Sequence, residues 1–282
     1  MHEVSAAAAP GGVQSFRERV PVPSLRPYVT SVWIQRVPTD APPYPHRTTP
    51  NASAEVVCPL GGVPALVGPR SGPAEQVVAP GTVTVGIRLR PGALAAVFRV
   101  PACELVDLTV PLDDLCGIRG AATGEAIAGA VSAGEAAAAL ETAVVSWATD
   151  SVPDPVVAEA VRRLQRGQVH DVAALAASIG MSRRQLRRRA EAAAGFPPKP
   201  LHRMLRLQRF LALTRRHDAA HAGLAVLAAQ AGFADQSHLS RECLRLTGRS
   251  PGTALHEARQ NCEGLHDHRA SDAPLLVPIG HG

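Results

Sequence analysis

The stretch Gly232–Pro251, GFADQSHLSRECLRLTGRSP, indicates the fold of the C-terminal half of the chain. It begins with a glycine that suits the turn after an Ala-rich helical pattern. Asp235 follows where an N-cap belongs, because its carboxylate can accept hydrogen bonds from the amides of the next turn. Gly248 is suited to end that helix, and Pro251 prevents its continuation. The stretch therefore predicts a helix-turn-helix unit.

The second helix of this unit has two kinds of face. Leu239, Cys243 and Leu246 recur at spacings of four and three, which is typical of a buried helical face. The other faces carry side chains that hydrogen-bond base edges or phosphates, namely Gln236, Ser237, His238 and Arg241. A helix of this kind is shaped for the major groove of DNA.

The same pattern occurs once before, at Leu175–Pro198 (LAASIGMSRRQLRRRAEAAAGFPP). Gly180 precedes Gly232 by 52 residues, whereas Gly195 precedes Gly248 by 53. One additional residue in the second turn region accounts for the difference. A repeat this regular predicts two helix-turn-helix units in the C-terminal domain.

A single helix is predicted between the two units. In PLHRMLRLQRFLALTRR, helical spacing is found for Leu201, Met204 or Leu205, Leu207 or Gln208, and Leu211. One continuous helix would hold the two units at a fixed distance. Both second helices could then enter successive major grooves, about 34 Å apart on one face of the DNA.

This arrangement resembles the AraC/XylS family of bacterial transcription regulators, over about residues 156–257. The first unit matches at Leu175, Ala176, Gly180, Met181, Ser182, Leu186, Arg187, Arg188 and Gly195. The second unit matches at Leu227, Ala228, Gly232, Phe233, Asp235–Arg241, Leu246–Gly248, Ser250 and Pro251. RLQRFLAL (Arg206–Leu213) is similar to the central helix of the family. Ala190 and Cys243 stand where the family usually carries Phe, so each second helix has a smaller core anchor.

The resemblance implies a sequence-specific regulator of transcription that binds double-stranded DNA. The base contacts carried over by position are Arg184, Arg187 and Arg188 in the first unit and Gln236, Ser237 and Arg241 in the second. Because Arg prefers guanine and Gln prefers adenine, the first helix predicts a G-rich half-site. The predicted DNA-binding set also includes Ser182, Arg183 and His238, for which phosphate contacts, helix capping and turn packing are alternative roles. RNA polymerase and a second protomer are further implied partners.

The positive charge of the chain belongs to one segment. Residues 1–150 carry 10 basic and 13 acidic side chains, residues 151–260 carry 18 and 8, and residues 261–282 carry 1 and 3. A basic segment of this kind attracts polyanions such as DNA. No apolar run reaches the ~18 residues of a membrane span, and the start lacks the features of a signal peptide. A reduced, cytoplasmic, soluble protein is expected.

Residues 16–118 contain short apolar runs separated by Pro and Gly, which indicate a β-rich domain, either a small barrel or a sandwich. We expect strands at 28–37, 55–58, 65–67, 76–78 and 82–89. RPYVTSVW (Arg26–Trp33), GIRLRPGAL (Gly86–Leu94) and ELVDLTVPLDDLCG (Glu104–Gly117) resemble a cupin-like effector domain that precedes this type of DNA-binding unit. The candidate residues for a small-molecule effector are Trp33, His46, Arg88 and Arg90. Their alternative roles are a core aromatic, a surface histidine and strand-edge charges.

The predicted fold class is α+β. Residues 1–15 are expected to be disordered. A helix in residues 119–150 carries Leu140, Val144 and Trp147 on one stripe, which either packs on the β-rich domain or pairs with a second protomer. Residues 151–155 form a Pro-rich linker and 156–258 the double helix-turn-helix domain. Residues 259–282 lack periodicity and are expected to be disordered.

Two other classes of function are open. A DNA-alkylation-repair enzyme with this DNA-binding unit uses a zinc-bound cysteine cluster, but residues 1–150 hold three distant cysteines, Cys58, Cys103 and Cys116. A redox-sensing regulator would use a thiol such as Cys116, whose pKa the two preceding aspartates would raise. An adventitious metal could bind the tail residues His256, Cys262, His266 and His268. GxSxG and HExxH are absent, and we expect no enzyme, no cofactor and no metal site.

Overall fold

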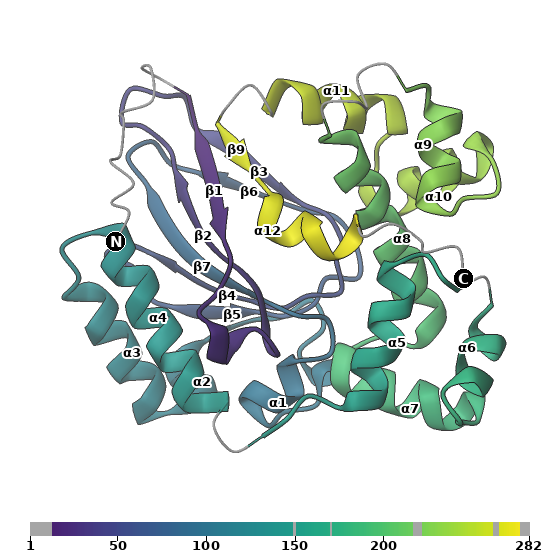
Figure 1. The fold of residues 1–282 in the computed structure, drawn as a ribbon. Coiled ribbons are helices and arrows are strands. Elements are labelled where there is room, and N and C mark those ends of the chain that lie inside the picture. The colour runs from purple at the N-terminus through teal and green to yellow at the C-terminus, as the bar shows by residue number, and fades with distance from the viewer. Residues whose placement is uncertain (1–12, 149–150, 170, 217–221, 262–264, 277–282) are drawn as a thin grey trace.

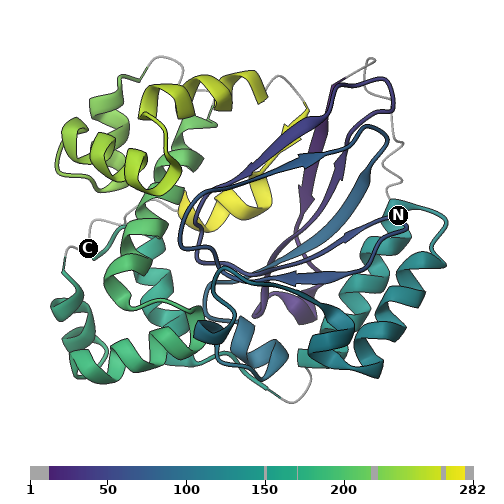
Figure 2. The same ribbon diagram turned by 180° about the vertical axis from the view of Figure 1, so that it is seen from behind.

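The protein has a β-rich part and a helical part that lie side by side (Figure 1). The computed structural model describes residues 13–148, 151–169, 171–216, 222–261 and 265–276. The view from behind shows the same two parts (Figure 2). The predicted α+β class, a β-rich N-terminal domain followed by a helical C-terminal domain, is confirmed. Within these ranges no helix is long and apolar enough to cross a membrane.

The N-terminal domain is built on a seven-stranded sheet in the order β8-β5-β4-β7-β2-β1-β9, with a separate ribbon of β3 and β6. The first strands are β1 (Ser15–Arg19), β2 (Val29–Arg36), β3 (Tyr44–Thr48), β4 (Glu55–Pro59) and β5 (Ala65–Val67). They are followed by β6 (Ala74–Val78), β7 (Val83–Leu89), β8 (Thr109–Pro111) and β9 (His266–Asp267). All pairs are antiparallel except β1 with β9. The five expected strands are present, whereas the pattern missed β1, β3, β8 and β9.

Four helices follow β7 in the N-terminal domain: α1 (Leu94–Phe98), α2 (Leu112–Cys116), α3 (Ile118–Ala128) and α4 (Ala133–Ala148). Helix α4 lies against β2 and β7, and its stripe of Leu140, Val144 and Trp147 is buried there. Of the two alternatives for this stripe, packing on the β-rich domain is therefore correct. The stripe is not free to pair with a second protomer.

The C-terminal domain contains seven helices among the residues that the structure describes. They are α5 (Pro155–Gln165), α6 (Val172–Ser178), α7 (Arg183–Ala194), α8 (Pro198–Thr214), α9 (Leu224–Ala231), α10 (Gln236–Thr247) and α11 (Pro251–Asn261). Helix α8 runs between the two pairs, with α6 and α7 at one end and α9 and α10 at the other (Figure 1). This is the predicted arrangement of two helix-turn-helix units and a linker helix.

One hydrophobic core joins both units through α8. Phe210 and Leu207 of α8 are fully buried at its centre. Cys243 is also part of this core, and its thiol lies 3.7 Å from the hydroxyl of Thr247. Ala190 is buried at the equivalent position of α7. Both small residues are thus fully enclosed, so the neighbouring side chains occupy the volume that a Phe would take.

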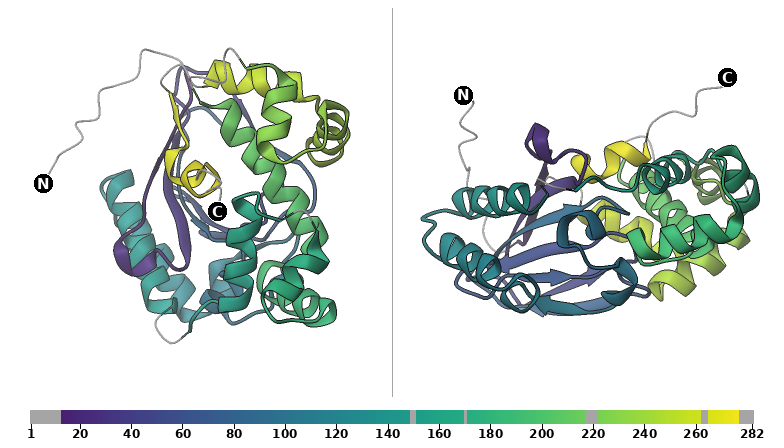
Figure 3. Two further views of the ribbon diagram at one scale, coloured as in Figure 1. Left: turned by 45° about the vertical axis from the view of Figure 1, so that its right-hand side comes forward. Right: turned by 90° about the horizontal axis from the view of Figure 1, so that it is seen from below.

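The C-terminal segment, residues 265–276, is folded and lies between the two domains (Figure 3). It consists of β9, helix α12 (Arg269–Asp272) and a 3-10 turn at Ala273–Leu275. The prediction that residues 259–282 are disordered is therefore wrong for this segment, as it is for the end of α11. Its order comes from distant partners, because β9 pairs with β1 and Asp272 pairs with Arg215 at the C-terminal end of α8. Contacts of this kind leave no periodic pattern in twelve residues.

At the other end of the chain, β1 begins at Ser15, one residue inside the expected disordered stretch. The rest of that stretch up to residue 12 lies outside the described residues, as does Cys262. Helix α5 begins at Pro155, the last residue of the expected linker, and is capped by Asp154. Tyr28 donates a hydrogen bond to the carbonyl of Ser151 at 2.7 Å.

Candidate DNA-binding surface and interdomain cavity

The first helix-turn-helix unit is formed by α6 and α7. Gly180 adopts a positive φ of 69° in the turn, a conformation that favours glycine. Ser182 then caps α7, and its hydroxyl and the side chain of Gln185 form a reciprocal capping box. Leu186 faces the core beside Ala190. The turn and the cap together set the direction in which α7 leaves the domain.

Four arginines of α7 are exposed: Arg183, Arg184, Arg187 and Arg188. Arg187 forms an ion pair with Glu191 one turn further along the helix, at 2.9 Å. Arg189 points elsewhere and binds Asp154 through two hydrogen bonds. Burial raises the pKa of Asp154, but the bonds from Arg189 and from two backbone amides bring it below its ordinary value. Arg189 thus links α7 to the start of α5, whereas the other four arginines are exposed and one of them, Arg187, is paired within the helix.

The second unit, α9 and α10, repeats this geometry. Gly232 has a φ of 89°, and Asp235 caps α10 by accepting a hydrogen bond from the amide of His238. Gln236, Ser237 and Arg241 are exposed at the start of α10. Helices α7 and α10 have the same length, and both begin one residue after a side-chain cap.

His238 is the predicted DNA-binding residue that the structure places least favourably. Its ring is half-buried, packs edge-on against Phe233 at 5.5 Å and lies 3.3 Å from the guanidinium of Arg206. Arg206 in turn lies over the ring of Phe233, at 4.5 Å. These contacts match the alternative role in turn packing. Sequence reasoning missed Arg206, because an arginine inside a helical pattern gives no sign of the aromatic ring beneath it.

A cavity of about 280 Å³ lies between the β-rich domain, the helical domain and the C-terminal segment. Trp33, His46 and Arg88 line it, whereas Arg90 does not. The guanidinium of Arg90 donates instead to the carbonyl of Arg26 at 2.6 Å. The structure thus brings together three of the four candidate effector residues.

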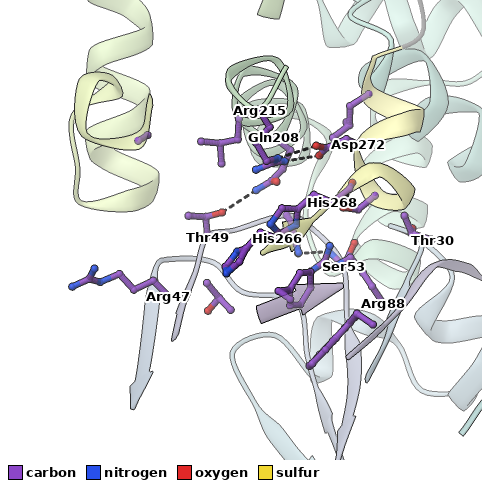
Figure 4. Close-up of a pocket in the computed structure, with 18 of the residues that line it drawn as sticks. Thr30, Arg47, Thr49, Ser53, Arg88, Gln208, Arg215, His266, His268 and Asp272 are labelled. Atoms are coloured by element: carbon purple, nitrogen blue, oxygen red, sulfur yellow. Dashed lines mark hydrogen bonds and ion pairs between the residues drawn. The ribbon is translucent and has the colours of Figure 1, made fainter. Parts of the chain in front are cut away.

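The charged groups of the cavity are held in pairs. Arg88 donates to Glu18 at 2.8 Å and to Glu55 at 2.9 Å. Burial alone would lower the pKa of Arg88, but the two carboxylates raise it above its ordinary value. Arg215 binds Asp272 across the cavity, and Figure 4 shows His266 and His268 between this pair and Arg88.

Three half-buried histidines line the cavity, and each has a lowered pKa. Burial is the main cause that lowers the pKa of His46, of His266 to about 4 and of His268 to about 2. The nearby guanidinium of Arg215 lowers the last two pKa values further. His266 and His268 were assigned to a disordered tail, so sequence reasoning missed them as cavity residues. The signal that could have suggested a structured element is the close succession of His, Asp and Arg side chains in HDHRASD, residues 266–272.

The cysteines of the structure are unpaired thiols. Burial raises the pKa of Cys116, while Arg119 lowers it, and burial raises the pKa of Cys58 to about 11. A raised pKa keeps a thiol protonated and slows its oxidation. Among the described residues no three potential ligands are close enough together to hold a metal ion.

Residues 175–257 match the family model of a helix-turn-helix domain. The C-terminal part of this chain is an AraC-type helix-turn-helix domain. Domains of this type bind DNA in transcriptional regulators, so the protein is a DNA-binding transcriptional regulator. Residues 17–111 match a domain of unknown function (DUF6597), which precedes the AraC-type domain as the sequence predicted.

The comparison with solved structures matches this chain to structures of ToxT from Vibrio cholerae. An apo variant of ToxT is 12% identical with a TM-score of 0.39, over 87% of this chain and 93% of that one. The wild-type protein with a bound unsaturated fatty acid is 12% identical with a TM-score of 0.38, over 86% and 94%. A further ToxT structure is 12% identical with a TM-score of 0.40, over 86% and 96%. No curated protein matches this sequence.

Proposed function

We propose that this regulator binds DNA by placing α7 and α10 in two successive major grooves. The observation that carries the proposal is the equivalence of the two helices. Each helix follows a turn that contains a glycine with positive φ, and a capping side chain directly precedes it. Each helix exposes polar residues in its first turns. Residues at the start of such helices reach base edges when the helix enters the major groove.

The helix between the two units supports a fixed spacing. Helix α8 has 17 residues and therefore a length of about 25 Å. Its side chains Leu201, Leu205 and Leu207 are buried among both units, so the units cannot rotate freely about it. Added to the width of the flanking helices, this length is compatible with grooves about 34 Å apart.

The exposed side chains suggest what each helix recognises. On α7 they are arginines, which favour the O6 and N7 atoms of guanine. On α10, Gln236 suits adenine and Arg241 suits guanine. We therefore expect a G-rich half-site and a mixed half-site, with Ser182, Arg183 and His238 contributing phosphate contacts or helix geometry.

We further propose that DNA binding is controlled by a small molecule in the cavity between the domains. The support is that the cavity touches α8, the helix that joins the two units, through Gln208 and Leu211, and Arg215 directly after that helix. A ligand that prefers one arrangement of the domains shifts DNA binding by its difference in affinity for the two arrangements. Contacts with RNA polymerase and pairing of two protomers stay predictions of the family resemblance.

The test is a selection of bound sequences from random duplex DNA with the full chain. We expect two enriched half-sites whose centres are one helical turn apart, one of them rich in G. Enrichment of a single half-site would contradict reading by two helices. No enrichment at all would contradict sequence-specific binding.

A further inference from the structure

The C-terminal segment (residues 265–276) is attached to the β-rich domain by strand pairing, ring contacts and hydrogen bonds. Strand β9 extends the sheet at β1, where Phe16 pairs with His266 and Arg17 with Asp267. The ring of His268 stacks on Phe16 with centroids 4.9 Å apart. The amide of Ser271 donates to Glu18 at 3.0 Å. The segment thus covers the edge of the sheet.

The same segment is attached to the helical domain. Asp272 is buried and accepts a hydrogen bond from Nε of Arg215, the residue that directly follows α8, at 2.8 Å. Leu275 is buried, and Leu276 packs against the core of the helical domain. The segment therefore joins the sheet to the helix that carries both DNA-binding units.

This segment is also one wall of the cavity. His266, His268, Ser271, Asp272 and Leu275 line it, opposite side chains of β2, β7 and α8 (Figure 4). The cavity exists with the segment in place, so the segment encloses the space and does not fill it. A molecule in the cavity would contact the segment and both domains at once.

The cavity offers no free positive charge to an anion among its described lining residues. Each of its four arginines is already paired: Arg47 with Glu75, Arg88 with Glu18 and Glu55, Arg215 with Asp272, and Arg249 with Glu257. An anion that displaced Glu18 from Arg88 or Asp272 from Arg215 would leave a buried carboxylate without its partner. The pairs of Arg47 and Arg249 lie nearer the surface, because the side chains of Glu75 and Glu257 are 52% and 39% exposed.

The cavity is equally unfavourable for a cation. Burial lowers the pKa of His46, His266 and His268 in its wall, and the guanidinium groups of Arg88 and Arg215 lower these pKa values further, so positive charge is disfavoured there. What remains for recognition is aromatic and hydrogen-bonding. Phe16, Trp33 and Tyr44 provide ring surface, and several hydroxyl and amide groups lie among them. The indole N–H of Trp33 is buried without a hydrogen-bond partner, which an acceptor on a ligand could supply after a small shift.

We propose that the C-terminal segment completes a binding site for a small uncharged molecule with hydrogen-bonding groups, and that this molecule fastens the segment and, through Arg215, helix α8 to the β-rich domain. The proposal rests on the ligand control described above and adds to it the class of ligand and the element that carries the coupling. The molecule binds the protein only while the segment is packed between the two domains, so by mass action it stabilises that arrangement.

The first test uses three probes of one shape and different charge: benzamide, benzoate and benzamidinium. Calorimetry with the full chain is expected to detect benzamide at millimolar concentration, the range for a ligand of this size. Benzoate and benzamidinium are expected to bind at least tenfold more weakly. Equal or tighter binding of either ion, or no binding of benzamide, would overturn the proposal.

The second test asks whether the segment forms the site. Asp272→Ala removes the link to Arg215, and Asp267→Ala is its control, since Asp267 pairs with the exposed Arg269 of the same segment. We expect benzamide affinity to fall at least tenfold in the first variant and to stay unchanged in the second. His268→Ala, with the exposed His256→Ala as control, gives the same comparison if Asp272→Ala does not fold. Equal affinities in variant and control would overturn the assignment.

The two proposals fail separately, because benzamide binding is measured without DNA and the DNA selection without benzamide. Benzamide is finally expected to change the affinity of the unaltered chain for its selected DNA, and to leave that of Asp272→Ala unchanged. If benzamide changes the DNA affinity of the unaltered protein and of Asp272→Ala equally, the segment does not couple ligand binding to DNA binding. This result would leave the ligand site and the DNA binding themselves unaffected.

Discussion

Gly86 of β7 lies against the indole of Trp33 on the paired strand β2. A β-carbon at position 86 would lie 2.2 Å from Cζ2 and 2.3 Å from Cε2 of that ring. Carbon atoms in contact are about 3.5–4.0 Å apart, so Gly86→Ala requires the indole to move by roughly 1 Å or more. Trp33 is 4% exposed and packs on Phe16 at 5.5 Å, which leaves it little room.

Overpacking of this kind typically costs about 1–3 kcal/mol. We expect Gly86→Ala to lower the free energy of unfolding by that amount and the melting temperature by roughly 2–12 °C. The assay is urea unfolding followed by tryptophan emission in a Trp147→Phe background. The chain has two tryptophans, so Trp33 is then the single reporter. The indole displaced from its site is also expected to change its emission in the native state.

Gly134→Ala is the matched control, because the nearest atom to its added methyl group is the hydroxyl of Ser132 at 3.7 Å. Alanine is favoured over glycine in a helix, so this variant of α4 is expected to be as stable as the parent or more stable. If Gly86→Ala unfolds at the same urea concentration as the parent, the contact between Gly86 and Trp33 does not constrain the sheet and the reasoning is refuted.

Four further outcomes are expected. Arg241→Ala weakens binding to the selected DNA by about 1–3 kcal/mol, measured by fluorescence anisotropy, while Arg162→Ala on the exposed face of α5 has no comparable effect. Raising the salt concentration weakens DNA binding steeply, because phosphate contacts release counterions; a flat titration would speak against a role for the arginines of α7. Ser182→Ala removes the cap of α7 and lowers stability by about 1 kcal/mol in urea unfolding; no loss would mean that the capping box is dispensable. Because the folded pKa values of His266 and His268 lie below the unfolded value of about 6.5, the unfolded chain binds more protons below that pH. The free energy of unfolding is therefore highest above about pH 6.5 and decreases as the pH falls toward about 4 and below. His268→Phe should make the free energy of unfolding depend less on pH in this range, and an unchanged dependence would exclude His268 as its source.

The helix-turn-helix units were predictable because their signals are local. A glycine at a left-handed turn, a capping residue and a buried stripe at spacings of three and four are all contained within about twenty residues. Gly180 and Gly232 have the positive φ that the pattern required, and α7 and α10 begin one residue after Ser182 and Asp235. The repeat strengthened both assignments, since the same signals recur with one additional residue.

The sheet was predicted in part. Strands with β-branched runs, such as β2 and β7, were identified by composition. Strand β3 starts within the stretch Pro42–Pro45, which its prolines mark as a turn, and it pairs only in the short ribbon with β6. Prolines are tolerated on strands of this kind because one side of the ladder is unpaired. Strand β1 has five residues, in which buried and more exposed side chains alternate around Phe16. So short a pattern does not identify a strand in the sequence, and its structure depends on pairing with β2.

The amino-acid sequence by itself determined the DNA-binding half of this protein, its repeat, its caps and the surface of each second helix, because these depend on residues within one or two helical turns. Only the tertiary structure decided that residues 265–276 are ordered and which residues line the cavity. His268, Asp272 and Arg215 have ordinary surroundings in the sequence. Their roles arise when β9 meets β1 and Asp272 meets α8, contacts that join residues more than fifty positions apart. Pairings at that range are set by the packing of whole domains, so the order of this segment and the enclosure of the cavity appear only when the chain is folded.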